Sequence, residues 1–329
     1  MEIPSIYPDK EYHSNLIQPS GCMGRMEDIA AWFSTRQGKK IPDAIKPAVV
    51  LFASDHNITS DVDYGESTTT AERTHAALDK NSIIRKLCKQ GSASLLIVDL
   101  GVREKLADMD DLEQAKIRTG SGNIAQEAAM DQGDYWESTG IGEEIANRMI
   151  ADGANLLIAG SISANNEVSV AAIISELVGL SPEEVLRSSS NGSPEIYAQE
   201  LIAVEAALSR TQGTPSHDIL RELGGFELAA MAGFYRAAAH QGVPVLLDDL
   251  ASTAAALAAA AWDVRIAGWM LASHVSSDNA GQRHAIDDLG LEPLMELNKS
   301  IGEARVATLL IPVIQSALSL QAGLVSLED

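Results

Sequence analysis

Basic residues are scarce in this 329-residue chain, where 24 Lys and Arg stand against 46 Asp and Glu, a formal net charge of −22. A nucleic-acid-binding protein needs clustered cations to displace the counterions of the phosphates, so we expect no nucleic-acid partner. Aromatic residues are also few, at 4% of the chain, whereas Ala, Leu, Ile and Gly are abundant. This composition is typical of helices packed closely over a parallel sheet, and not of an all-β sandwich.

Only two cysteines are present, Cys22 and Cys88, and they share no CxxC spacing. This argues against a disulfide framework or a structural zinc site, and favours a reducing, cytoplasmic compartment. The seven histidines are scattered without an i,i+4 pair, so we expect no metal and no other cofactor. The N-terminus lacks the pattern of a signal peptide, and the longest apolar run, at 250–262, is too short to span a bilayer. We therefore expect no association with a membrane.

Short apolar runs bounded by turn residues predict buried strands. They lie at 48–54, 93–102, 154–160, 243–250 and 266–274. Each run is continuous rather than alternating, as in strands that are covered on both faces. Helical patterns lie between the runs, and several of them end in glycine just before a strand. This alternation predicts an α/β fold with a mostly parallel sheet flanked by helices.

The two ends of the chain fall outside the alternation. Residues 1–45 contain one helical pattern, at 24–38, and residues 285–329 read as further helices. Because chain termini are often neighbours, we expect these ends to pack together as a small helical subdomain. Residues 46–284 would then form the large α/β domain that binds the substrate.

Ligands of an open parallel sheet bind beyond the carboxyl ends of its strands. Polar residues that follow the predicted strands are Asp55, His56, Asp99, residues 160–166, Asp248, Asp249 and His274. For His56 the residues leave two readings open, a ligand-binding pair with Asp55 or a hydrogen-bonded anchor at a strand end. Glu303 follows a glycine and precedes a helical run, so it is either a helix cap or a general base. The fold argument alone indicates a small-molecule site and names no reaction.

Several strings, in the same order across most of the chain, resemble one enzyme family. They are GCMGRMEDIAAW (21–32), FASDHNIT (52–59), SGNIAQEAAM (121–130), GGFELAAMAG (224–233), LLDDLASTAAAL (246–257), LGLEPLMELN (289–298) and IGEARVATLLIP (301–312). The chain is identified by them as a member of the nicotinate-nucleotide:dimethylbenzimidazole phosphoribosyltransferase family. The resemblance implies a Rossmann-like sheet with a small helical domain, usually a homodimer, and a metal-free reaction.

The reaction implied by this resemblance moves the phosphoribosyl group of nicotinate mononucleotide to a nitrogenous aromatic base. Nicotinate is released, and the α-ribazole phosphate formed supplies the lower ligand of a cobamide. Glu303 matches the glutamate of the family's G-E-G-T-G-A motif, which is the general base. The implied substrate-binding residues are Tyr64 at the base, loops 160–166 and 187–192 at the phosphate with Gly160, Ser161, Asn166, Ser189 and Ser190, and Asp248 and His274 on the ribose side or supporting it. Arg305 is new in this chain beside the expected base, and it would supply a displaced anion site.

The chain departs from the family where the phosphate is bound. The family's G-E-M-G-I-G-N-T-T loop reads GSISANNEV at 160–168, which places Glu167 where the family has a hydroxyl. Its G-R-G-T-G loop aligns with RSSSN at 187–191, and a family lysine falls on Glu200. Both glutamates would repel a phosphate. An alternative therefore stays open: a catalytically impaired homologue that acts as a binding or regulatory protein, or as a partner subunit of an intact paralogue.

Overall fold

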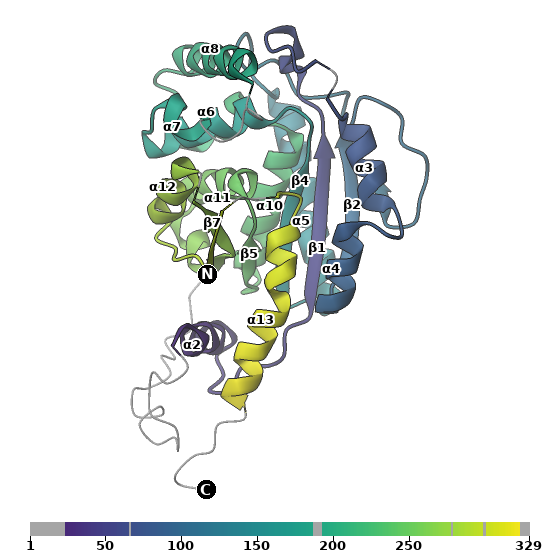
Figure 1. Ribbon diagram of the computed structural model, residues 1–329, viewed down its shortest axis with the longest axis vertical. Coiled ribbons are helices and arrows are strands. Elements are labelled where there is room, and N and C mark those ends of the chain that lie inside the picture. Colours follow the sequence, from purple (N-terminus) through teal and green to yellow (C-terminus); the bar gives the residue numbers. More distant parts are fainter. Residues whose placement is uncertain (1–23, 66, 187–192, 278, 299–300, 323–329) are drawn as a thin grey trace, which may run out of the picture.

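A six-stranded parallel sheet forms the centre of the computed structural model (Figure 1). The structure describes residues 24–65, 67–186, 193–277, 279–298 and 301–322. The strand order is β3-β2-β1-β4-β5-β6. The bounds are β1 Pro47–Ser54, β2 Ser94–Gly101, β3 Leu112–Gln114, β4 Leu156–Ile162, β5 Val245–Leu247 and β6 Met270–Ala272. All five neighbouring pairs are parallel, which confirms the predicted α/β class.

Strand β1 lies at the centre of the sheet, and all eight of its residues are buried. Its alternate side chains belong to two different cores, because successive residues of a strand point to opposite faces. Val50 and Phe52 belong to one core, whereas Val49 and Leu51 belong to the other. Because both faces of β1 are covered, its sequence is a continuous apolar run rather than an alternating one, and this run predicted the strand.

Two layers of helices cover the sheet (Figure 1). Against one face lie α5 (Gln132–Ala151), α10 (Phe226–His240) and α11 (Leu250–Trp262). The same core includes residues of α6 (Glu167–Val178), α7 (Pro182–Leu186), α8 (Pro194–Arg210) and α9 (Ile219–Leu223). The other face is covered by α2 (Arg25–Gln37), α3 (Thr70–Leu78), α4 (Ile83–Gly91) and α13 (Arg305–Ala322). None of the described helices is both long and apolar enough to cross a membrane.

Helices from the two ends of the chain, α2 and α13, pack against each other (Figure 1). Helix α13 also packs on α4, which lies beside β2. The upper half of α13 therefore covers the sheet, and its lower half contacts α2 (Figure 1). The subdomain boundaries at residues 45 and 285 stay a prediction.

The structure differs from the sequence-based expectation in two stretches. The helical pattern between the runs at 48–54 and 93–102 forms two helices, α3 and α4, because the Ser82 side chain accepts a hydrogen bond from the Arg85 N–H and so begins a new helix. The run at 266–274 starts as a 3₁₀ helix, Val264–Trp269, before β6. A second, two-stranded sheet of β7 (His274–Ser276) and β8 (Met295–Leu297) follows, beside α12 (Ala280–Asp288). Strands of three residues are too short to show a period in the sequence.

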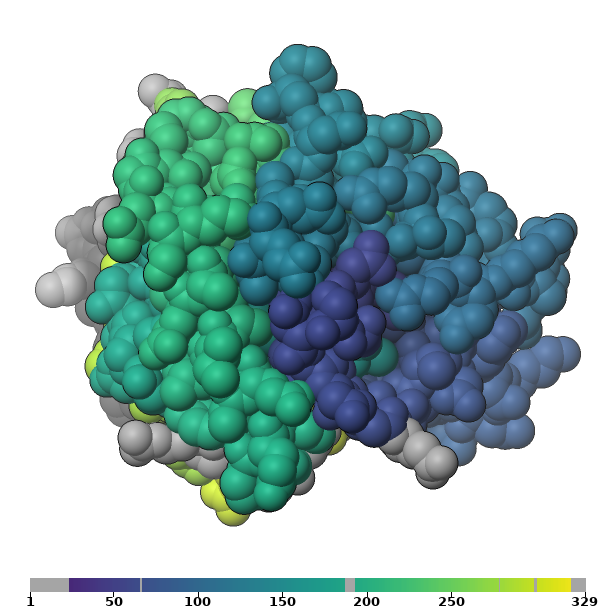
Figure 2. Space-filling view, turned by 90° about the horizontal axis from the view of Figure 1, so that it is seen from above, coloured from purple at the N-terminus to yellow at the C-terminus, as the bar shows by residue number. Residues whose placement is uncertain are grey.

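The reversal of the strand order beside β1 marks the place where a ligand is expected to bind. β1 pairs with β2 on one side and with β4 on the other, so the strand order reverses between β1 and β4. In open parallel sheets the crevice at such a reversal, outside the carboxyl ends, is where ligands bind. Seen from this edge, the purple segment that follows β1 lies between green residues of the α8–α10 region and blue residues that follow α3 (Figure 2).

Candidate active site

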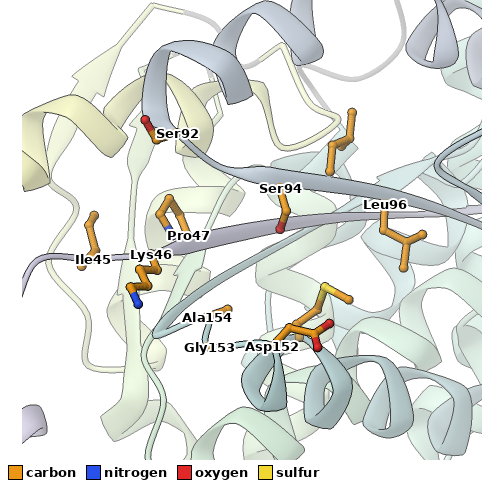
Figure 3. A pocket seen from close by; sticks show the side chains of 11 residues that line it. Ile45, Lys46, Pro47, Ser92, Ser94, Leu96, Asp152, Gly153 and Ala154 are labelled. Atoms are coloured by element: carbon orange, nitrogen blue, oxygen red, sulfur yellow. The ribbon is translucent and has the colours of Figure 1, made fainter.

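The amino edge of the sheet carries an open cavity of about 530 Å³ (Figure 3). It is lined at the starts of β1 and β2 by residues such as Pro47, Ser94 and Leu96, with Lys46 and Asp152 as its charged groups. None of the polar side chains named for its lining is buried. Without converging buried polar groups, this cavity has the shape of a ligand site but not its chemistry.

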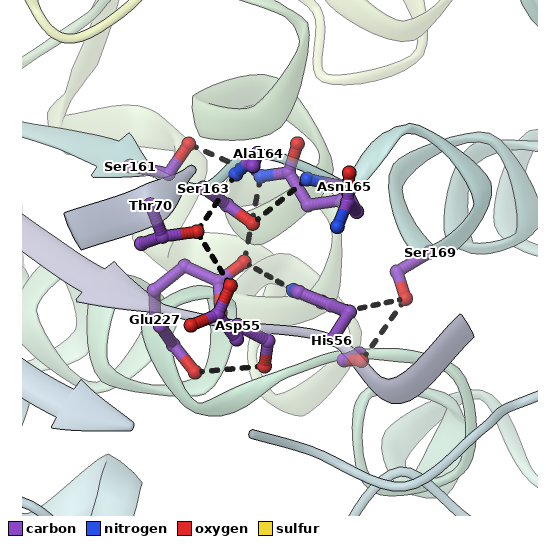
Figure 4. Close-up of polar contacts among 12 residues, drawn as sticks. Asp55, His56, Thr70, Ser161, Ser163, Ala164, Asn165, Ser169 and Glu227 are labelled. Atoms are coloured by element: carbon purple, nitrogen blue, oxygen red, sulfur yellow. Dashed lines mark hydrogen bonds and ion pairs between the residues drawn. The ribbon is translucent and has the colours of Figure 1, made fainter. Parts of the chain in front are cut away.

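At the carboxyl edge, hydrogen bonds fix the loop that follows β4 (Figure 4). The Thr70 hydroxyl donates to Asp55 Oδ1 over 2.7 Å and accepts from the Ala164 N–H over 3.0 Å. Arg73 Nη1 donates to the Ser163 carbonyl over 2.8 Å. The loop is thereby tied to the end of β1 and to the first turn of α3, which holds it in shape without a ligand.

His56 is an anchor at the end of β1. Its Nε2 lies 2.8 Å from Glu227 Oε1 and its Nδ1 lies 3.1 Å from Ser169 Oγ (Figure 4). Burial lowers the pKa of His56, but the charge and hydrogen bond of Glu227, helped by Asp55 and Glu167, outweigh it and leave the pKa raised. Because both ring nitrogens have protein partners, the anchor reading holds, and His56 joins β1 to α6 and α10.

The Glu227 carboxylate also reaches the loop that follows β4. Asn166 Nδ2 lies 3.4 Å from Glu227 Oε1 and donates to Ser161 Oγ over 3.2 Å. Asn166 is thus oriented by a buried carboxylate, with Ser161 beside it at the end of β4. Glu227 was not among the predicted site residues, although it lies in the GGFE string that carried the resemblance.

Glu303 lies in an unusual turn at the start of α13. Gly302, Glu303 and Ala304 all have positive φ, 58°, 56° and 59°. Two contacts hold this turn against the sheet: Asp248 Oδ1 accepts from the Ala307 N–H over 2.7 Å, and Gly160 in β4 lies directly below Ala304. A Cβ on Gly160 would lie 2.6 Å from Ala304 N, so the close approach requires glycine there.

The Glu303 carboxylate is mostly buried, with 14% of its side chain exposed, and forms an ion pair with Arg305. Burial raises its pKa, the charges of Arg305 and Arg73 oppose the rise, and the charge of Asp249 adds to it. A mostly buried carboxylate whose pKa lies above the ordinary value is suited to accept a proton. Arg73, which the sequence analysis missed, gives this site a second cation.

A second group of acids lies on the α6–α8 side. Burial raises the pKa of Glu200 to about 7, with the charge of Glu167 adding to the effect and contact with Tyr64 opposing it. Burial also raises the pKa of Glu167, against its own N–H and the charges of Arg73 and His56. Burial and the two glutamates raise the pKa of the Tyr64 hydroxyl, which therefore stays protonated.

Of the predicted site residues, the structure brings together Gly160, Ser161, Asn166, Glu303, Arg305 and Asp248. Tyr64 belongs to the group with Glu167 and Glu200. His274 lies on β7, where its Nδ1 is 3.0 Å from Ser273 Oγ, and burial lowers its pKa to about 4, so it is neutral. Ser189 and Ser190 lie outside the described residues. Within the part of the chain that the structure describes, no three His, Cys, Asp or Glu side chains could together hold a metal ion.

Comparison with known proteins adds an independent line of argument. A family model described as phosphoribosyltransferase matches residues 9–329. The nicotinate-nucleotide–dimethylbenzimidazole phosphoribosyltransferase of Chromobacterium violaceum is 35% identical over 317 residues, 95% of this chain and 92% of that protein. The enzyme of that name from Thermus thermophilus is 32% identical, over 92% of this chain and 90% of the relative. The crystal structure of a Thermus thermophilus enzyme of that name superposes with a TM-score of 0.89 at 30% identity, over 97% and 96% of the two chains.

Proposed function

The chain belongs to the phosphoribosyltransferase family, and on that premise we propose that it transfers the phosphoribosyl group of nicotinate mononucleotide to a ring nitrogen of an aromatic base such as dimethylbenzimidazole. The products are nicotinate and an α-ribazole phosphate, a precursor of the lower ligand of a cobamide. Support comes from relatives of that name that align over nine-tenths or more of this chain.

The buried Glu303 carboxylate is the observation that carries the mechanism. As general base it takes the N–H proton of the incoming base, whose nitrogen then forms the bond to C1′ of the ribose. The bond from C1′ to the nicotinate nitrogen breaks, and its electron pair returns to the pyridine ring. Positive charge that develops at C1′ in the transition state is stabilised by nearby carboxylates. Glu303 is held for this role by the turn that Asp248 and Gly160 fix.

We assign the phosphate of the donor to Arg73 and Arg305, the two cations that act on Glu303. Arg305 Nε is buried and has no hydrogen-bond partner among the described residues, so a donor is available there. Guanidinium groups bind phosphate through two parallel N–H donors. The oriented Asn166 and Ser161 would complete this side of the site, with Asp248 and His274 nearer the ribose.

The test is release of nicotinate from nicotinate mononucleotide in the presence of dimethylbenzimidazole. Glu303→Gln keeps the shape of the side chain but removes the proton acceptor, so the rate should fall about 10²- to 10⁴-fold. Glu144→Gln, at an exposed position on α5, is the matched control and should keep the full rate. An unchanged rate in Glu303→Gln would remove Glu303 from the mechanism.

The rival proposal, a non-catalytic homologue, rests on the two glutamates Glu167 and Glu200. It requires that the purified chain releases no nicotinate alone and does so when mixed with a paralogue. We expect turnover by the chain alone, as a homodimer in the cytoplasm. Sedimentation velocity of the purified chain, with and without a paralogue, measures the assembly.

A further inference from the structure

The side chains of His56 and Glu227 form a buried ion pair next to the loop that follows β4 (Figure 4). The Ser169 hydroxyl donates to the Gly224 carbonyl over 3.2 Å, so its single hydrogen is used and it must accept from His56 Nδ1 over 3.1 Å. His56 Nε2 lies 2.8 Å from Glu227 Oε1, and the proton between them belongs to the ring, in agreement with its raised pKa. His56 therefore carries both ring protons, and Glu227 Oε1 is an acceptor.

This ion pair fixes the direction in which the amide of Asn166 points. Glu227 Oε1 lies 3.4 Å from Asn166 Nδ2, and an acceptor oxygen can be paired there only with an N–H donor. The second hydrogen of the same nitrogen donates to Ser161 Oγ over 3.2 Å. Both amide hydrogens are thus engaged within the protein, so the Asn166 side chain has no N–H left for a ligand.

The hydroxyl of Ser161 ends this chain of hydrogen bonds. Its Oγ accepts from Asn166, and its own hydrogen has no acceptor among the described residues. Hydrogen bonds in a chain polarise one another, so a hydroxyl that accepts one bond donates more strongly to the next acceptor. Ser161 is therefore prepared to donate a hydrogen bond to an atom that the described protein does not supply.

The neighbours of Ser161 indicate which ligand group supplies that atom. Gly160, the preceding residue, packs against the turn that holds the general base, since a Cβ on it would lie 2.6 Å from Ala304 N. Two residues after Ser161, the Ser163 carbonyl accepts from Arg73 Nη1 over 2.8 Å. Arg73 is one of the two cations to which the phosphate of the donor is assigned. The oxygens of a phosphate dianion are acceptors, so a hydroxyl donor near a guanidinium suits them.

We propose that Glu227 is a positioning residue for the donor nucleotide: through Asn166 it turns the hydroxyl of Ser161 outward, and that hydroxyl donates a hydrogen bond to the phosphate. The proposal rests on the proposed function, because nicotinate mononucleotide is taken as the donor. Glu227 touches no substrate atom in this arrangement and acts only through Asn166. Its loss should therefore weaken the binding of the phosphate and leave the proton acceptor Glu303 in place.

Calorimetric titration with nicotinate mononucleotide and with nicotinate riboside measures this contact without turnover. Ser161→Ala should weaken the binding of the mononucleotide about tenfold or more, the ratio expected for a hydrogen bond to a charged group, and leave the binding of the riboside unchanged. Asn166→Ala leaves the hydroxyl free to turn and should weaken the binding of the mononucleotide about three- to tenfold. Ser209→Ala, exposed on α8, is the matched control and should keep both affinities.

Double variants show whether Glu227 and Asn166 act through Ser161. In the background of Ser161→Ala, neither Asn166→Ala nor Glu227→Met should cost further affinity, since the hydroxyl that they position is gone. In the wild-type background, Glu227→Met keeps the volume without the acceptor and should lose as much affinity as Asn166→Ala. Glu227→Gln keeps an acceptor oxygen and should restore most of it. Thermal unfolding verifies that each variant is folded, and the Asn166→Ala cycle decides the result if Glu227→Met does not fold.

Unchanged affinity of Ser161→Ala for the mononucleotide would overturn the inference. An equal loss for the riboside would overturn it as well, because the hydroxyl would then contact the ribose and not the phosphate. Losses from Asn166→Ala that add in full to those of Ser161→Ala would mean that Asn166 has a merely structural role, and the positioning by Glu227 would fail with it.

Release of nicotinate is measured on the same preparations. Ser161→Ala should raise the KM for the mononucleotide about tenfold and leave kcat unchanged, since a phosphate contact is the same before and during the transfer. If the binding data show the coupling but the wild type releases no nicotinate, the proposed function fails and the positioning by Glu227 stands. If nicotinate is released and Ser161→Ala leaves KM unchanged, the positioning fails and the proposed function stands.

Discussion

Asp248, directly after β5, accepts through its Oδ1 a hydrogen bond of 2.7 Å from the main-chain N–H of Ala307, which lies 59 residues later in the chain. Ala307 is in the first turn of α13, where N–H groups have no partner within the helix. The bond therefore caps α13 from the sheet. It also fixes the turn of Gly302–Ala304, so the place of Glu303 depends on a strand end far away in sequence.

Removal of this bond should disturb both stability and catalysis. In Asp248→Ala the Ala307 N–H is left buried without its acceptor, which should lower the free energy of unfolding by about 1–3 kcal/mol. The rate should fall as well, because Glu303 is no longer held. Asp248→Asn keeps an acceptor oxygen and should restore most of both losses. Urea unfolding and nicotinate release measure the two effects, and equal behaviour of the Ala and Asn variants would contradict this role.

Gly160 is the second contact that holds the turn. In Gly160→Ala the new Cβ would lie 2.6 Å from Ala304 N and 2.9 Å from Ala304 Cβ, so the main chain of the turn must move. A displacement of about 1 Å can cost a rate of about 10²-fold. We expect that loss in kcat together with a lower midpoint of thermal unfolding.

The matched control for Gly160→Ala is Gly140→Ala in the middle of α5, where a Cβ would have nothing within 4 Å. It should stabilise the protein by about 0.5–1 kcal/mol, since Ala loses less conformational freedom than Gly in a helix. A Gly160→Ala variant as active and as stable as the wild type would show that the turn is free to shift.

The fold could be predicted because its signals are local. The run at 48–54 is apolar at every position but the last, Ser54, since both faces of β1 are buried, and strand β1 was found at Pro47–Ser54. Strand β3, Leu112–Gln114, could not be predicted, because three residues at the sheet edge carry neither a period nor a core composition. Pairing and strand order depend on contacts between distant segments, which composition does not encode.

The site was predicted only where the resemblance or a strand end indicated it. Glu303 and Asp248 were predicted in this way. Arg73 was missed because nothing in the sequence of the short helix α3 distinguishes it from an ordinary solvent-facing charge, and only the packing of α3 turns it toward Ser163. The interaction between Glu167 and Glu200 could not be inferred from their spacing in the sequence, because they belong to different helices, α6 and α8.

The pH profile should report the state of Glu303. Its pKa lies above the ordinary value because it is buried, while Arg305 opposes the rise. A general base must be ionised, so kcat/KM should fall as the pH falls through this raised pKa. Arg305→Gln removes the opposing charge, so the acidic limb should move to higher pH. Arg265→Gln, an exposed arginine paired with Asp263, should leave the limb in place. A shift to lower pH in Arg305→Gln would contradict the assignment.

Glu200 should make the folded state less stable as the pH rises. Burial, and then the charge of Glu167, raise its pKa from 4.5 to about 7. The folded protein therefore keeps a proton on Glu200 at pH values where the unfolded chain has lost it. For a group with a raised folded pKa of this kind, stability is highest below pH 4.5, declines as the pH rises to about 7, and then levels off.

Glu200→Gln has no charge to bury and should remove this decline. Its advantage over the wild type in free energy of unfolding should therefore grow between pH 4.5 and 7, and reach on the order of 2–3 kcal/mol above that range once solvent screening is allowed for. Glu205→Gln should give no such trend, because its carboxyl is exposed. Urea unfolding of the three proteins at pH 5 and pH 8 measures the difference. A variant Glu200→Gln that is less stable than the wild type at pH 8 would contradict the raised pKa of Glu200.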